Sequence, residues 1–99
     1  MIVVAGRIRV KAEERGEAVR VALKMADATR TETGCVSYRF YADISDPNTF
    51  FIFEEWESDD ALAQHFQTPH MAEFQRQIPR FVAGPFEIKR YVVESAVSM

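Results

Sequence analysis

The residues best suited to chemistry lie in one short segment, Glu54–Met71, which reads EEWESDDALAQHFQTPHM. The segment contains a carboxylate, Glu54, an indole, Trp56, and two imidazoles, His65 and His70. Imidazole changes charge near neutral pH, and burial raises the pKa of a carboxylate, so both kinds of group are suited to proton transfer. The segment therefore predicts one wall of a small-molecule pocket.

His65 and Glu54 are the candidate catalytic residues. His65 lies on the apolar side of a predicted helix, where a histidine is either a core residue with one hydrogen bond or a proton-transfer group. Glu54 shares a strand face with Trp56, and a carboxylate on an apolar face needs a partner. Glu54 is therefore either a structural residue with a hydrogen bond or an arginine partner, a base with a raised pKa, or the residue that orients His65.

Aromatic side chains near this segment suit a flat ligand, and an indole or phenol adds one directional hydrogen bond. The alternative is that Tyr38 and Trp56 belong to the core and that His70 is a solvated or capping residue at a helix start. The candidate substrate-binding residues are Tyr38, Phe40, Trp56, Phe66, His70 and Phe74.

No pattern in the sequence predicts a metal or a cofactor. His65 and His70 are five residues apart across Pro69, which is not the i, i+4 spacing of a helical metal pair. The sequence has no glycine-rich phosphate loop and no G-x-S-x-G motif. Cys35 is the one cysteine, and a buried structural thiol is the expected role.

Composition limits the function classes further. The chain has 99 residues, a net charge of −3 and no basic block, which disfavours nucleic acid or an anionic membrane as a partner. No apolar run approaches the roughly 18 residues that a membrane span needs, and the alternating start is unlike a signal peptide. We expect one cytoplasmic domain over residues 2–92 that binds a small molecule.

Hydrophobic periodicity predicts a β-α-β-β-α-β order, the split βαβ pattern of ferredoxin-like α+β folds. That fold has a four-stranded antiparallel sheet with its helices on one face. Ser58 and Thr68 are predicted helix caps, and residues 43–48 are expected to form a loop longer than a tight turn. The predicted strands are 2–10, 35–42, 49–56 and 86–94, and the predicted first helix is 13–33.

The strands are apolar on both faces. Phe51 and Phe53 point to the side opposite Phe50 and Ile52, and one layer of helices cannot bury both sets. An uncovered apolar sheet face predicts a partner, most simply a second copy of the chain.

The segment around the two histidines resembles the antibiotic biosynthesis monooxygenase (ABM) superfamily, whose members are dimeric α+β barrels. The helix-to-strand junction with Glu32, Gly34, Cys35 and Tyr38 is also similar to that family. The resemblance spans about residues 2–92 and implies a homodimer whose two sheets pack face to face. The residues that carry it in the segment are Glu54, Trp56, Glu57, Ser58, His65, Thr68, Pro69, His70 and Met71.

The resemblance implies a cofactor-independent monooxygenase that acts on a quinol or another electron-rich aromatic molecule. The alternatives are an isomerase of a small carbonyl compound, phosphorylated or not, and a small-molecule-binding dimer without catalysis. Haem degradation, found in another branch of the family, is disfavoured because Gly6, His65 and Gln75 stand where that branch has its characteristic asparagine, tryptophan and histidine.

Overall fold

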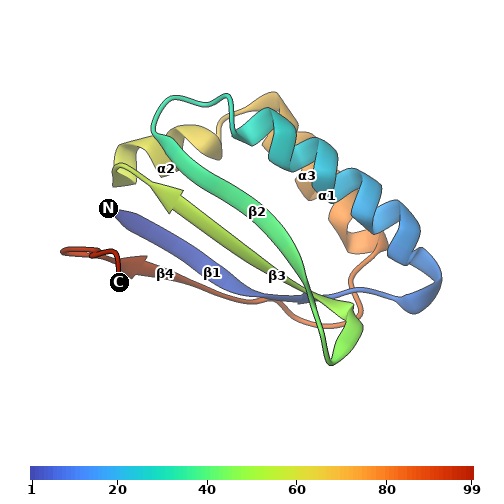
Figure 1. The fold of residues 1–99 in the computed structure, drawn as a ribbon. Helices are drawn as coiled ribbons and strands as arrows, with labels where there is room; N and C mark the ends of the chain where they lie inside the picture. Colours follow the sequence, from blue (N-terminus) through green and yellow to red (C-terminus); the bar gives the residue numbers. More distant parts are fainter.

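The computed structural model describes all 99 residues. The chain folds into one four-stranded antiparallel sheet with helices on one side (Figure 1). The strands lie in the order β2-β3-β1-β4, so the two central strands are β3 and β1. This is the predicted ferredoxin-like α+β fold. The strands are β1 (Ile2–Arg9), β2 (Cys35–Asp43), β3 (Asp46–Trp56) and β4 (Glu87–Val92), and the helices are α1 (Arg15–Thr29), α2 (Asp59–His65) and α3 (Pro69–Gln77), with 3₁₀ turns at Ala12–Glu14 and Ile78–Arg80.

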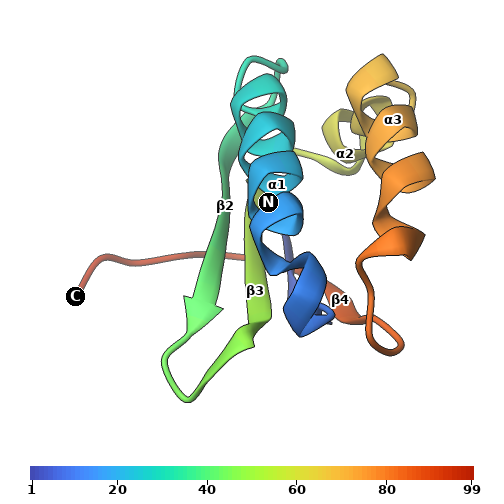
Figure 2. The ribbon, with the colours of Figure 1, turned by 90° about the vertical axis from the view of Figure 1, so that its right-hand side faces the viewer.

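The core lies between the sheet and the helical layer, and Figure 2 shows that all the helices cover the same face of the sheet. Alternate residues of each strand enter this core, as period-two patterning requires. Ile52, Trp56 and Tyr38 contribute from β3 and β2, and they meet Met25 and Ala26 from α1. None of the helices combines the length and hydrophobicity that a membrane crossing requires.

The first helix ends at Thr29, four residues before the predicted end. The N–H of Arg30 bonds back to the carbonyls of Ala26 and Ala28, and the hydroxyl of Thr31 donates to the Ala28 carbonyl over 2.7 Å. These bonds satisfy the free carbonyls of the last turn and end the helix early. Gly34, with φ +85, then turns the chain into β2. The early end places Glu32 in a turn, where its side chain leaves the helix axis.

The connection between β2 and β3 is shorter than predicted. The two strands pair up to Asp43 and Asp46, which leaves only Ile44 and Ser45 as the turn. The Asp43 carboxylate accepts from the Ser45 N–H over 2.7 Å, which stabilises this tight connection in place of the expected loop.

The sheet face opposite the helices carries several aromatic residues and no covering layer. Tyr41, Phe51 and Tyr91 are 51%, 39% and 48% exposed. Arg7 and Glu87 form an ion pair on the same face, 2.8 Å apart. The sequence prediction of a second, uncovered apolar face is therefore matched by the arrangement of the strands.

Gly6 and Gly16 offer a matched test of the fold. A Cβ on Gly6 would lie 2.1 Å from the Glu87 carbonyl oxygen, so Gly6→Ala must push β4 away from β1. We expect a loss of about 1–3 kcal/mol of unfolding free energy in urea titrations. Gly16→Ala in α1 meets nothing within 4 Å and should be neutral or stabilising by up to about 1 kcal/mol. Equal effects at both positions would contradict the close approach of β4.

Candidate functional site

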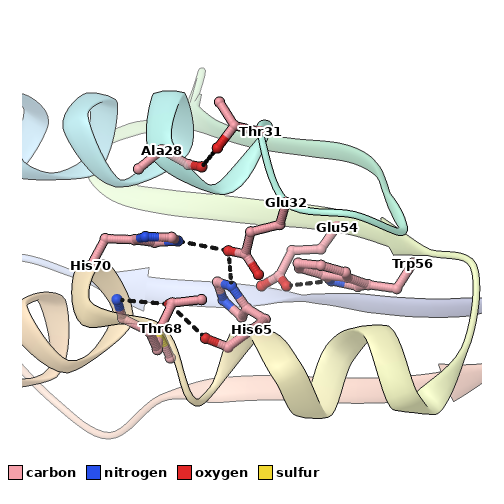
Figure 3. Close-up of polar contacts among 9 residues, drawn as sticks. Ala28, Thr31, Glu32, Glu54, Trp56, His65, Thr68 and His70 are labelled. Carbon is pink, nitrogen blue, oxygen red and sulfur yellow. Dashed lines mark hydrogen bonds and ion pairs between the residues drawn. The ribbon is translucent and has the colours of Figure 1, made fainter.

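The site centres on the carboxylate of Glu32, which binds both histidines of the chain (Figure 3). One oxygen, Oε2, lies 2.7 Å from Nδ1 of His65 and 2.6 Å from Nε2 of His70. The His65 side chain is 2% exposed, Glu32 is 11% exposed and His70 is 26% exposed. A nearly buried carboxylate thus has two imidazole partners, one in the core and one that reaches solvent.

Thr68 fixes the two histidines relative to each other. His65 is the last residue of α2, and His70 lies in the first turn of α3. The Thr68 hydroxyl donates to the His65 carbonyl over 2.7 Å and accepts from the Met71 N–H over 3.2 Å (Figure 3). Pro69 at the first helical position pre-sets the backbone of this turn. The T-P-H sequence is therefore a short rigid connection between two imidazoles, and the predicted Thr68 cap is confirmed.

The Glu32 carboxylate determines which ring nitrogen of each histidine carries the hydrogen. A carboxylate only accepts hydrogen bonds, so each ring carries its hydrogen on the nitrogen that faces Glu32. This assigns Nδ1–H to His65 and Nε2–H to His70, and neither remaining ring nitrogen has a protein partner. An imidazole oriented by a carboxylate on one nitrogen, with the other nitrogen free, has the arrangement of a general base.

Glu54 is bound to Trp56 instead of to His65. Its Oε1 accepts from the indole Nε1–H over 2.9 Å, and the residue is 7% exposed. The hydrogen bond that orients His65 comes from Glu32, so the interpretation of Glu54 as its orienter has no support in the contacts. Burial, aided by the negative charge of Glu32, raises the pKa of Glu54 to about 7, against the lowering effect of the Trp56 hydrogen bond.

The aromatic candidates divide between the core and the surface. Trp56 and Tyr38 are 0% and 2% exposed and pack on the His65 ring, with centroids 4.8 and 5.7 Å away. Phe40 packs edge-on against Tyr38, at a centroid distance of 5.7 Å. Phe66 is 50% exposed. Trp56 and Tyr38 thus hold His65 in place from the core side.

His70 and Phe74 line a cleft of about 360 Å³ between α1 and α3. Its other side chains include Met25 from the core and Lys24 and Glu73, which are charged. This volume is in the range of small-molecule sites. Of the candidate residues, only His70 and Phe74 line this cleft, so His70, and not the buried His65, is the histidine that a ligand in the cleft reaches.

Glu32 is the site residue that sequence reasoning missed, because the predicted helix continued through it. The helix-to-strand junction at Gly34 was the available signal. His65 and His70 do not have the spacing of a helical metal pair, but the fold brings both rings to the Glu32 carboxylate. Cys35 is less suited to nucleophilic chemistry, because burial and the nearby Glu32 charge raise the pKa of its thiol to about 11.

The raised pKa of Glu54 predicts that the stability of the folded chain depends on pH. Its pKa is higher in the folded chain than in the unfolded chain, so the folded state holds the proton more tightly. Folding therefore loses stability as pH rises from about 4.5 to about 7. Glu54→Gln keeps an acceptor for Trp56 and removes this cost.

We expect Glu54→Gln to match the wild type near pH 4 and to exceed it at pH 8 by on the order of 2–3 kcal/mol of unfolding free energy. Urea titrations of both proteins across this range measure the difference. A difference that does not change with pH would show that Glu54 is ionised at no cost in the fold.

Comparisons with known proteins agree with this fold. An uncharacterized protein of Synechocystis is 42% identical over 92 residues, which cover 93% of this chain and 63% of that protein. The chain thus spans somewhat less than two thirds of that relative's length. The Bacillus subtilis protein described as "Putative monooxygenase YcnE" is 29% identical and is covered over 95% of its length, with 91% of this chain aligned.

Among solved structures, one described as a putative antibiotic biosynthesis monooxygenase from Deinococcus radiodurans superposes with a TM-score of 0.92. It is 26% identical, with 100% of this chain and 98% of that chain aligned. The family model for "Antibiotic biosynthesis monooxygenase" matches residues 1–77, which include all of α1, α2 and α3 and both histidines. The chain belongs to the antibiotic biosynthesis monooxygenase family.

Proposed function

We propose that this protein is a cofactor-independent monooxygenase that oxidises a quinol or a similar electron-rich aromatic molecule. The observation that carries the proposal is the shared Glu32 carboxylate, which orients two imidazoles beside a cleft of ligand size. Membership of a monooxygenase family supports the reaction class. Medium-sized apolar side chains in the cleft, Met25 and Phe74, suit an aromatic ring.

The proposed reaction begins when His70, through its free Nδ1, takes a proton from a quinol hydroxyl in the cleft. Glu32 stabilises the imidazolium that forms, and His65 holds the same carboxylate oxygen from the core side. The quinol anion then gives an electron to dioxygen, and the two radicals combine. One oxygen atom stays in the hydroxyquinone product and the other leaves as water, so the substrate supplies all the electrons.

Oxygen uptake with a panel of quinols tests this proposal. We expect His70→Ala to lower kcat by roughly 100-fold or more in folded protein, as loss of a general base does, and His65→Gln to lower it far less because glutamine can still donate to Glu32. His65→Gln keeps hydrogen bonding and approximate size without the basic nitrogen. Gln64→Ala, an exposed position one residue before His65 on α2, is the matched control and should keep full activity.

Unchanged kcat in a folded His70→Ala variant would contradict the role of the histidine pair. Proton exchange into a small carbonyl compound without oxygen uptake would instead identify an isomerase, which can use the same proton-transfer groups. No turnover with either class of substrate would favour the third candidate, a small-molecule-binding protein without catalysis. Activity that is lost on chelation and restored by one metal would contradict the cofactor-independent reaction.

We also propose that the protein acts as a homodimer through the uncovered sheet face. Tyr41, Phe51 and Tyr91 give this face its aromatic character, and Arg7 and Glu87 supply charges of both signs. A face with mixed charges and apolar centres can pair with a copy of itself around a two-fold axis.

Sedimentation velocity at micromolar concentration tests the dimer. We expect the wild type to sediment as a dimer and Phe51→Glu to sediment as a monomer, because the new carboxylate would be buried without a partner. Leu23→Glu changes an equally apolar residue, 57% exposed on the helical side, and should remain dimeric. A monomeric wild type, or a dimeric Phe51→Glu variant, would remove the proposed interface.

A further inference from the structure

We propose that Glu32, His65 and His70 form a binding site for one divalent transition-metal ion, with Zn²⁺ as the best match. The three side chains offer two imidazole nitrogens and one carboxylate oxygen that all lie within 4.8 Å of one another. The inference goes beyond the proposed oxygenation reaction, because it concerns what the same three groups bind when no substrate is involved.

The donor set favours zinc over harder ions. Two imidazoles and one carboxylate are the protein ligands of a common class of zinc site that leaves a fourth position for water or a small ligand. Mg²⁺ and Ca²⁺ prefer oxygen donors, and two of these three donors are nitrogen. His70, whose side chain is 26% exposed, also lines the cleft between α1 and α3 and connects the cluster to solvent.

In this structure Glu32 is hydrogen-bonded to both imidazole rings, and these groups must rearrange before an ion can bind between them. Glu32 Oε2 lies 2.7 and 2.6 Å from the two ring nitrogens. Zinc bonds of about 2.0–2.2 Å in a tetrahedral site place ligand atoms roughly 3.3–3.6 Å apart. The carboxylate oxygen must therefore move away from the two ring nitrogens by about 1 Å, and the two ring nitrogens must approach each other by about 1 Å. Glu32 belongs to a turn, so rotation of its side chain can supply much of this movement.

The groups around the ligands restrict larger movements. Thr68 ties the backbone of His65 to the start of α3, and Trp56 packs on the His65 ring with its centroid 4.8 Å away. A donor set held by three separate elements loses little conformational freedom when an ion binds. This distinguishes the cluster from the exposed carboxylates elsewhere on the surface.

Metal binding would inhibit the proposed oxygenation. An ion on His70 Nε2 leaves the ring hydrogen on Nδ1, which is the nitrogen that the reaction needs free. This consequence rests on the proposed function, but the binding itself does not. If both hold, added Zn²⁺ lowers quinol-dependent oxygen uptake and a chelator restores it.

Calorimetric titration of chelator-treated, dialysed protein with ZnCl₂ tests the site directly. We expect one ion per chain in the wild type. His70→Ala and Glu32→Gln should each weaken binding by roughly 100-fold or more, since even the residues that support a ligand cost about 10–100-fold. Glu13→Gln, an exposed carboxylate on the 3₁₀ turn before α1, is the matched control and should bind like the wild type.

Imidazole signals in nuclear magnetic resonance spectra identify the ligands, because the chain contains only two histidines. Zinc should shift the signals of both rings at one equivalent, and thermal unfolding of each variant confirms that it is folded. Absence of binding in the wild type, a shift of His70 alone, or wild-type affinity in folded Glu32→Gln would each overturn the site. Quinol oxidation without zinc binding would leave the proposed function intact, and zinc binding without oxidation would leave only the metal site.

Discussion

The structure of the site depends on one constraint, which is that the nearly buried carboxylate of Glu32 must be satisfied. An unpaired carboxylate at 11% exposure would be costly, and two imidazoles on a single oxygen remove most of that cost. Because His65 ends α2 and His70 begins α3, the same two bonds connect the turn after α1 to both helices. Loss of Glu32 leaves the buried Nδ1–H of His65 without its partner, whereas loss of either histidine leaves Glu32 with one imidazole instead of two.

A second buried contact supports the first from the sheet side. Glu54 holds the Trp56 indole by its N–H, and the indole packs against the His65 ring. The position of His65 is therefore set by a carboxylate on one side and by an aromatic wall on the other. Burial raises the pKa of Glu54 to about 7, so this support loses stability as pH rises from about 4.5 to about 7.

Local patterns predicted the fold better than the site. Period-two alternation placed the strands, and Ser58 and Thr68 predicted both short helices, because these signals act within a few residues. The end of α1 was predicted four residues late, since hydrophobic spacing does not report the back-bonded carbonyls at Ala26 and Ala28. Glu32 was consequently missed, and its contact with His70 spans 38 residues. A contact of this kind follows from the fold and leaves no local pattern.

The most direct test of the shared carboxylate is the tautomer of each histidine, observed by long-range ¹H–¹⁵N correlation in mildly alkaline solution, where free imidazoles are neutral. The arrangement predicts that His65 carries its hydrogen on Nδ1 and His70 carries its hydrogen on Nε2, so the two rings give opposite patterns. Glu32→Gln should disturb both patterns together. The Nε2–H form at His65, or rings that are insensitive to Glu32→Gln, would contradict the central role of this carboxylate.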